Sequence, residues 1–362
     1  MRALCLGLVC AFLSLPVQAD RFKEWDRNKD GKLQKEELPP NARRNFERVD
    51  TDKNGVISLA EHKAFLNRRS GGGQRQQAHP DYQTVRDQDY AGSGNQRQML
   101  DLFLPREKSE KPRPLLVYIH GGGWRGGSKE GAFRRLQPLL EGSGFAGAAI
   151  NYRLTNEASW PAQIHDCKAA IRWLRGNAKK YGIDPKRIAV WGSSAGGHLV
   201  SMLGSSGGKE ELEGKLGKHL DQSSRVSAVI NYYGPSALLK MDDYPSKIVH
   251  NDPRSPESQL IGNPIQKSKK KALQASPLHF VSPDDAPHIH FHGTDDPLVP
   301  FNQSEIYHEA LKKAGVQSTL ITSKGGGHNM PGTFTRRFVL PYLDHAFHRK
   351  GKLINDQTVV SD

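Results

Sequence analysis

The chain has 362 residues, of which 36% are hydrophobic and 25% are charged, and its mean hydropathy is low. This length exceeds one usual domain, and the composition is typical of a soluble globular protein with polar connecting segments. The formal net charge of +14 at pH 7 favours contact with acidic surfaces or polymers. Nucleic acid is not an expected partner, because the lysine run at Lys267 and 269–271 has no interleaved aromatic residues. We interpret this run as the solvated face of a helix; attraction to anionic polysaccharide or a cell surface is the functional alternative.

Residues 1–19 have the features of a signal peptide. Arg2 supplies the positive start, residues 3–15 form an apolar core too short to cross a bilayer, and residues 17–19 offer a cleavage site before Asp20. We therefore expect a secreted or periplasmic protein without a transmembrane segment.

Three cysteines bear on the redox chemistry of the chain. Cys5 and Cys10 lie within the expected signal peptide, which leaves Cys167 as the lone thiol of the mature chain. An intrachain disulfide is then impossible, and we expect Cys167 to be a small core residue.

Two twelve-residue segments near the N-terminus, 26–37 and 50–61, fit the pattern of a calcium loop. Each has oxygen-bearing residues at positions 1, 3 and 5, a glycine at position 6, an apolar residue at position 8 and a glutamate at position 12. The expected ligands are Asp26, Asn28, Asp30, Lys32, Gln34 and Glu37 in the first loop and Asp50, Asp52, Asn54, Val56, Ser58 and Glu61 in the second. The two loops together resemble an EF-hand pair, and the resemblance implies Ca²⁺ as the cofactor.

The pair differs from sensor EF-hands in ways that bear on its role. Only residues 20–25 precede the first loop, so its entering helix is about one turn long, and each loop has three acidic ligands. Both features favour modest affinity and a structural calcium ion rather than a switch. Two calcium loops also resemble a dockerin, whose partner is a cohesin scaffold, but Glu37 and Glu61 at the loop ends favour EF-hands.

The composition of residues 20–362 changes along the chain and predicts four successive segments. Residues 20–66 hold the EF-hand pair, and residues 67–80 are rich in Gly, Gln and basic residues, as in a flexible linker. Apolar strands then alternate with helical segments through residues 81–350, which predicts an α/β fold with a mostly parallel central sheet covered on both faces. Residues 351–362 are expected to form a C-terminal tail.

The pentapeptide at 192–196, Gly-Ser-Ser-Ala-Gly, follows an apolar run at 187–191 and precedes a helix-forming stretch at 198–203. A GxSxG sequence between a strand and a helix is typical of a nucleophile elbow, in which a sharp turn exposes the central serine. The central residue here is Ser194, so the chain is interpreted first as a serine hydrolase.

A second glycine-rich turn follows the apolar strand expected at 115–119. Its sequence, His120-Gly121-Gly122-Gly123-Trp124, lacks side chains that would keep backbone N–H groups away from a ligand. We expect the N–H groups of Gly121 and Gly122, with that of Ala195, to form an oxyanion hole.

An acid and a base follow further along the chain. The strand expected at 289–291 leads to Asp295 and Asp296, and a glycine run at 325–327 precedes His328. The order Ser, Asp, His is that of α/β-hydrolases and not that of chymotrypsin or subtilisin. We favour Asp296 over Asp295 because it begins the sequence Asp-Pro-Leu-Val-Pro. His328 would then move the proton of Ser194 and be oriented by the acid.

The other histidines in this region have a different interpretation. His288, His290 and His292 lie in or beside the strand before the acid, and we expect them to be packed or at the surface. The absence of a carboxylate cluster at metal-ligand spacing argues against a zinc site.

Further segments carry a resemblance to a known family. Residues 160–174, 181–185, 229–235, 275–277 and 285–287, together with the two glycine motifs, resemble the HGGG-containing esterases and lipases, near the bacterial acetylxylan and feruloyl esterases, over about residues 80–350. The resemblance implies a Ser194–Asp296–His328 triad, an oxyanion hole at Gly121, Gly122 and Ala195, and ester chemistry without a cofactor. It also implies a small-molecule or polysaccharide ester substrate, with acetyl or feruloyl groups on plant or algal polysaccharide favoured.

Three alternatives remain at this stage. A general short-chain carboxylesterase or lipase would use the same residues. A serine exopeptidase would need an added element that docks a peptide terminus, and a non-catalytic calcium-dependent binding protein would be expected to lack members of the triad.

Two features bear on substrate selection. Trp124, Tyr152 and Trp160 follow expected strand ends and could stack on a sugar or aryl group, although packing under a loop is the favoured role. The segment 238–272, rich in Pro, Ser and charged residues, is expected to overhang the active site.

Overall fold

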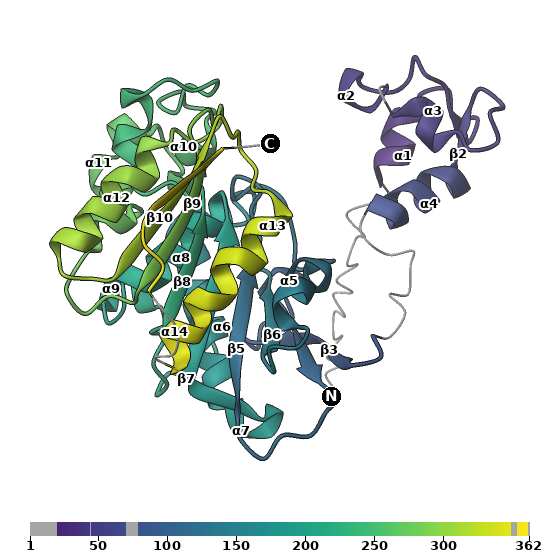
Figure 1. Ribbon diagram of the computed structural model, residues 1–362. Helices are drawn as coiled ribbons and strands as arrows, with labels where there is room; N and C mark the ends of the chain where they lie inside the picture. The colour runs from purple at the N-terminus through teal and green to yellow at the C-terminus, as the bar shows by residue number, and fades with distance from the viewer. Residues whose placement is uncertain (1–19, 44, 70–78, 349–352, 361–362) are drawn as a thin grey trace, which may run out of the picture. The chain divides into compact units, whose positions relative to one another are not determined.

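The computed structural model describes residues 20–43, 45–69, 79–348 and 353–360 (Figure 1). The expected signal peptide and most of the expected linker, residues 70–78, lie outside these ranges. The chain divides into two compact units, Met1–Gln77 and Ala78–Asp362. In the described parts of the chain, no helix is both long enough and apolar enough to span a membrane.

The N-terminal unit is built around the two predicted calcium loops. Its elements are α1 (Asp20–Trp25), β1 (Lys32–Leu33), α2 (Pro40–Arg43), α3 (Phe46–Val49), β2 (Ile57–Ser58) and α4 (Leu59–Arg69). Strands β1 and β2 pair antiparallel, with Leu33 opposite Ile57. These two residues occupy position 8 of their loops, and both are buried in a core with Phe22, Phe46 and Val49. The apolar position of each loop therefore ties the two loops together.

The second unit has a nine-stranded sheet in the order β11-β10-β9-β8-β7-β5-β6-β4-β3. The strands are β3 (Tyr82–Asp89), β4 (Met99–Pro105), β5 (Arg113–Ile119), β6 (Ala146–Ile150), β7 (Ile183–Ser193), β8 (Ala228–Tyr232), β9 (His288–Gly293), β10 (Ser318–Lys324) and β11 (Gln357–Val360). Strand β4 pairs antiparallel with β3 and β6, and the other neighbours are parallel. The predicted α/β fold with a mostly parallel sheet is confirmed.

Helices cover both faces of this sheet (Figure 1). The longer ones are α5 (Ala132–Leu140), α6 (Ala162–Gly176), α8 (Ala195–Ser205), α12 (Asn302–Lys313) and α14 (Leu340–His348). The shorter ones are α7 (Ala178–Tyr181), α9 (Glu210–Glu213), η1 (Gln96–Gln98), η2 (Leu238–Asp243), α10 (Pro256–Ile261), η3 (Ile265–Lys267), α11 (Lys269–Gln274), η4 (Pro277–Phe280), α13 (Gly332–Phe334) and η5 (Thr335–Val339).

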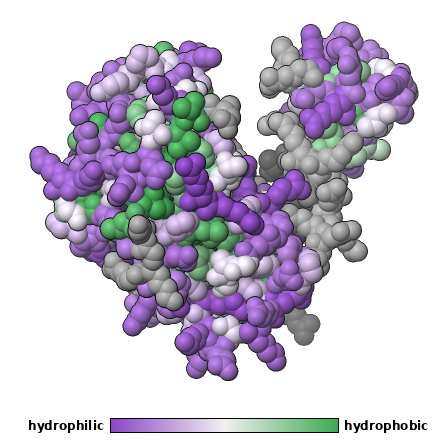
Figure 2. Space-filling model, viewed as in Figure 1, coloured by the Kyte–Doolittle hydropathy of each residue, from purple (hydrophilic) through white to green (hydrophobic). Residues whose placement is uncertain are grey.

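Side chains of the central strands point alternately to the two faces of the sheet, and each face has its own hydrophobic core. In β5, Val117 packs in one core with α6 and α8, whereas Leu116 packs in the other with α5 and α14. Successive side chains of a strand point to opposite faces, which explains why β5 is apolar at nearly every position. Cys167 of α6 is buried in the first core, as predicted. Hydrophilic residues cover most of the face drawn in Figure 2.

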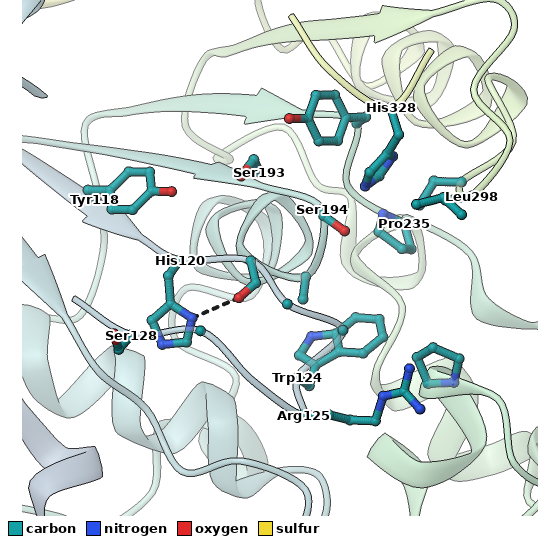
Figure 3. Close-up of a pocket in the computed structure, with 18 of the residues that line it drawn as sticks. Tyr118, His120, Trp124, Arg125, Ser128, Ser193, Ser194, Pro235, Leu298 and His328 are labelled. Carbon is teal, nitrogen blue, oxygen red and sulfur yellow. Dashed lines mark hydrogen bonds between the residues drawn. The ribbon is translucent and has the colours of Figure 1, made fainter. Parts of the chain in front are cut away.

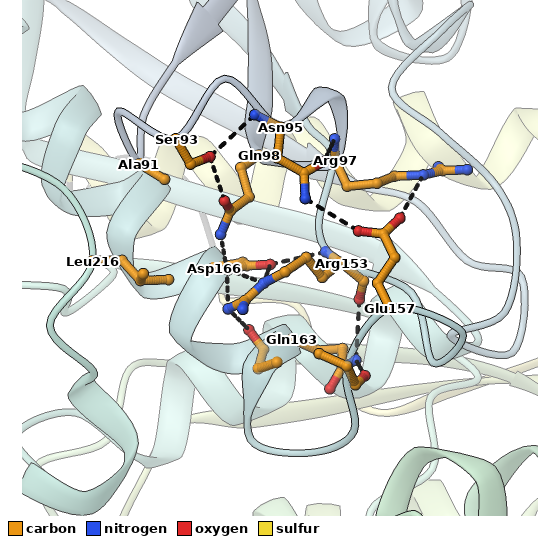
Figure 4. A network of polar contacts seen from close by, with 12 residues as sticks. Ala91, Ser93, Asn95, Arg97, Gln98, Arg153, Glu157, Gln163, Asp166 and Leu216 are labelled. Atoms are coloured by element: carbon orange, nitrogen blue, oxygen red, sulfur yellow. Dashed lines mark hydrogen bonds and ion pairs between the residues drawn. The ribbon is translucent and has the colours of Figure 1, made fainter. Parts of the chain in front are cut away.

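A buried polar network joins three segments of the first core (Figure 4). Asp166 of α6 accepts hydrogen bonds from Gln98 Nε2 at 2.7 Å and from Arg153 N at 2.8 Å, and its Oδ1 lies 2.7 Å from Arg153 Nη2. The network therefore fixes η1 and the loop after β6 against α6.

The structure refines two boundaries predicted from the sequence and shows how the lysine run is exposed. Helix α4 continues to Arg69, into the expected linker. The expected tail contains β11, which pairs in parallel with β10 and so belongs to the sheet. In the insertion 238–272, Lys267, Lys269 and Lys270 are exposed, as expected of a solvated helix face, whereas Lys271 is half-buried and donates to the Ile261 carbonyl oxygen.

Candidate active site

Ser194 lies at the turn between β7 and α8. Its backbone has φ 55° and ψ −122°, a conformation that side chains rarely adopt. The flanking glycines are required by space, because a Cβ on Gly192 would collide with the Gly196 carbonyl and a Cβ on Gly196 would collide with the Ile119 carbonyl. The GxSxG sequence therefore folds as the predicted elbow.

The glycine run after β5 packs directly against this elbow. A Cβ on Gly121 would lie 2.6 Å from the Ser193 carbonyl oxygen and 3.4 Å from Ser194 Cβ. Gly122 has φ 115°, which favours glycine. Ala195 is the first residue of α8, so its N–H belongs to the unpaired donors of a helix N-terminus. Gly121, Gly122 and Ala195 line the same pocket as Ser194.

His120 holds the glycine run in place, a contact that the sequence analysis did not predict. Its Nδ1 lies 2.8 Å from the Gly121 carbonyl oxygen, and its ring stacks on Tyr152 at 4.3 Å. Burial lowers the pKa of His120 to about 4, so the ring is neutral near pH 7. The Gly121 carbonyl shares a peptide unit with the Gly122 N–H. Fixing the carbonyl therefore fixes the direction of that donor.

His328 contacts Asp296 and not Asp295. Its Nδ1 lies 2.7 Å from Asp296 Oδ2, and the N–H groups of Leu298 and Val299 donate to Asp296 Oδ1 at 2.8 and 3.0 Å. Burial acts to raise the pKa of Asp296, but hydrogen bonds from His292 and His328 outweigh burial and lower it below the usual range. Asp295 is exposed and accepts a hydrogen bond from Thr294 Oγ1.

The three histidines of β9 are all buried, and one of them reaches the acid. His288 packs on Tyr307, and the ring of His290 lies 5.5 Å from that of His288. His292 places its Nε2 3.2 Å from Asp296 Oδ2. This contact was not predicted from the sequence, although the place of His292 near the carboxyl end of β9 was a signal that could have indicated it.

Ser194 and His328 line one pocket of about 600 Å³. In Figure 3 the Ser194 hydroxyl and the His328 ring point into the same space. The ring of Tyr233 lies 4.3 Å from that of His328. With Nδ1 bound to Asp296, the His328 ring keeps Nε2 for a proton from a group in the pocket. A serine, an imidazole, a carboxylate and N–H donors around one cavity can together carry out acyl transfer.

Residues from several segments form the pocket walls. Ile248 and Pro256, both from the insertion 238–272, line the pocket beside Leu298, so the insertion borders the site as expected. The side chains of Arg125 and Arg135 add positive charge to the lining of the pocket. Trp124 lines the pocket while buried at 1% exposure, whereas Tyr152 and Trp160 are packed inside the unit.

The calcium loops offer an oxygen-rich donor set. Ligand atoms of Asp50, Asp52 and Glu61 all lie within 4.8 Å of one another. Gly31 and Gly55, at position 6 of their loops, have φ of 78° and 86°. In the first loop, Asp26 accepts hydrogen bonds from the N–H groups of Asp30 and Gly31. These residues fit a hard cation such as Ca²⁺, with Lys32 and Val56 at the position that offers a backbone carbonyl.

Comparison with known proteins gives the family. Residues 100–311 match the BD-FAE family, and residues 18–38 and 44–66 match the EF hand. A probable carboxylic ester hydrolase of Mycobacterium tuberculosis, LipM, is 28% identical over 250 residues, which is 68% of this chain and 52% of LipM. The chain thus spans about half the length of that curated relative.

Two solved structures extend the comparison. A truncated carbohydrate esterase from gut microbiota is 34% identical with a TM-score of 0.68, covering 74% of this chain and 95% of its own. An acetyl ester-xyloside bifunctional hydrolase from Caldicellulosiruptor lactoaceticus is 26% identical with a TM-score of 0.53, covering 68% and 85%. With more than half of its length matched, the chain belongs to the BD-FAE family of α/β-hydrolase domains and has an EF-hand region ahead of that domain.

Proposed function

We propose that this protein is a serine carboxylic-ester hydrolase with Ser194 as nucleophile, His328 as general base and Asp296 as the acid that orients it. The observation that carries the proposal is the 2.7 Å contact between His328 Nδ1 and Asp296 Oδ2 on a pocket that also contains the Ser194 elbow. Relatives named as esterases support the same chemistry.

The proposed reaction has two stages. Ser194 Oγ attacks the ester carbonyl while His328 Nε2 takes its proton, and the N–H groups of Gly121, Gly122 and Ala195 stabilise the oxyanion. His328 then returns the proton to the leaving alcohol. Water then attacks the acyl-enzyme while His328 takes its proton, and His328 gives that proton to Ser194 Oγ as the acid leaves. His328 and water carry every proton, so the ester chemistry itself calls for no cofactor.

We favour acetyl or feruloyl esters of plant or algal polysaccharide as substrates. Support comes from the carbohydrate esterase and the acetyl ester-xyloside hydrolase among the relatives, and from a pocket large enough for part of a saccharide. A general short-chain carboxylesterase or lipase is the second candidate, favoured by apolar Ile248 and Leu298 at the pocket. The complete set of Ser194, Asp296 and His328 argues against a non-catalytic binding protein.

The test is release of acetate from acetylated xylan and of ferulate from feruloylated arabinoxylan, with 4-nitrophenyl acetate as a small ester. We expect release from polymer that is lost in Ser194→Ala. Activity on the small ester alone would favour the second candidate. Inactivity on all three esters would contradict an esterase function.

We also propose that the protein is exported and that both EF-hand loops hold structural Ca²⁺. The features of residues 1–19 support export. The clustered carboxylates of the second loop and the turn of the first loop around Asp26 support calcium. N-terminal sequencing of the protein isolated from its host should begin at Asp20; retention of residues 1–19 would contradict export.

A further inference from the structure

A second imidazole is hydrogen-bonded to the acid of the proposed triad. His292 lies in β9 and is fully buried. Its Nε2 lies 3.2 Å from Asp296 Oδ2 and 3.0 Å from the Val299 carbonyl oxygen, while its Nδ1 lies 2.8 Å from Ser304 Oγ. Both neighbours of Nε2 are acceptors, so Nε2 carries a hydrogen and His292 donates to Asp296.

This donor completes the hydrogen bonding of the carboxylate. The N–H groups of Leu298 and Val299 occupy Oδ1, and His328 and His292 share Oδ2. Each donor withdraws negative charge from the oxygen that it contacts, which makes that oxygen a weaker base. A less basic Oδ2 stabilises the positive charge of a protonated His328 less.

We propose that His292 is a positioning residue that shares Asp296 Oδ2 with His328, fixes the plane of the carboxylate and extends the activity of the site toward acidic pH. The proposal rests on the serine-esterase function above, in which neutral His328 is the reactive form. His292 touches no substrate in this role and acts through Asp296.

Other titratable groups face His292 and Asp296 from the surrounding elements. They are His290 on β9, Glu305 on α12, Tyr233 after β8 and His328 itself. Burial raises the pKa of Glu305 and lowers the pKa of His290, so both changes favour the neutral form. Among the described residues, only His328 and His292 donate side-chain hydrogen bonds to Asp296. His292 is therefore the group whose removal changes Asp296 most directly.

The experiment compares His292→Leu, which removes the donor, with His292→Gln, whose amide can restore it. The readout is kcat/KM for 4-nitrophenyl acetate from pH 4 to pH 9. We expect the acid limb of His292→Leu to move up by about one pH unit and that of His292→Gln to lie nearer the wild type. His290→Leu is the matched control, since it removes a buried histidine from the same strand and should keep the wild-type acid limb.

Two further measurements keep the test decisive if His292→Leu does not fold. Ser304→Ala removes the hydroxyl that contacts Nδ1 of His292. The acid limb of this variant should move to higher pH by less than that of His292→Leu. NMR titration of the His328 ring follows its protonation without turnover. An unmoved acid limb in the His292 and Ser304 variants, or an equal shift in His290→Leu, would overturn the proposal. An inactive wild-type protein would instead contradict the esterase function, and the His328 titration would still test the shared hydrogen bond.

Discussion

Asp295 and Asp296 are adjacent in the sequence and differ in the direction of their side chains. Asp296 is buried against His328, whereas Asp295 is exposed at a turn. We expect Asp296→Asn to lower kcat by about 10⁴-fold, because an amide at this position no longer stabilises a positively charged His328. Asp295→Asn is the matched control and should keep kcat near that of the wild type. Equal losses in the two variants, measured with 4-nitrophenyl acetate, would contradict the assignment.

The sequence predicted which residues meet at the pocket and missed how they are held. Ser194, Asp296 and His328 each follow a strand of a parallel sheet, and the carboxyl ends of such strands share one edge, so their convergence is predictable. The contact of His120 with Gly121 and that of His292 with Asp296 depend on ring orientation across a turn. Residue order places His292 near the carboxyl end of β9, on the side of the acid, but it does not give the direction in which the ring points.

At the scale of elements, the network around Asp166 is expected to stabilise the first core. Asp166 is fully buried and binds Arg153 and Gln98. Asp166→Ala leaves Arg153 without its carboxylate, so we expect the free energy of unfolding to fall by about 3–5 kcal/mol. Urea denaturation measures this change in the unfolding transition of the second unit, Ala78–Asp362. Asp252→Ala, at an exposed pair with Arg254, should leave the unfolding midpoint unchanged, and similar midpoints for the two variants would contradict the prediction.

Element types were more predictable than element boundaries. The alternation of apolar strands and helices gave the α/β fold, since each pattern reflects burial on one or both faces. The expected tail instead contributes β11, whose four residues are mostly exposed and show no apolar alternation. Its place in the sheet depends on pairing with β10, and a partner strand distant in sequence is not encoded by local pattern.

Calcium is expected to stabilise the N-terminal unit and not the second unit. Carboxylates of Asp50, Asp52 and Glu61 crowd together, and a bound cation would relieve their repulsion. We expect a chelator to lower the melting temperature of the N-terminal unit and to leave that of the second unit unchanged, as measured by calorimetry. Glu61→Gln should reduce the rise in melting temperature that calcium gives to the N-terminal unit. A chelator without effect on either transition would contradict a structural role.

The second unit should lose stability in mild acid. Burial lowers the pKa of His120, His198 and His288 to about 4, whereas the unfolded chain binds protons near pH 6.5. The unfolded state therefore binds more protons between these values, so stability is complete above pH 6.5 and falls as pH decreases toward 4. Burial raises the pKa of Asp285 to about 6 and also raises that of Glu305, which opposes the trend, whereas burial lowers the pKa of His165, His290 and His308 and reinforces it.

Urea unfolding midpoints at pH 7.5 and pH 5 check this prediction. We expect the midpoint at pH 5 to be lower, and we expect His288→Gln to reduce the difference between the two midpoints. Equal midpoints for the wild type would contradict it.

Strand β11 also has a consequence for aggregation. It pairs with the outer edge of β10, from Ile321 opposite Gln357 to Lys324 opposite Val360. A shortened protein ending at residue 350, the boundary suggested by composition, would leave the N–H and C=O groups on that edge of β10 without these partners. Exposed strand edges pair readily with other chains. Strand β11 has four residues and β10 has seven, so the described sheet ends in a shorter edge strand, which offers fewer groups for pairing with further copies of the protein.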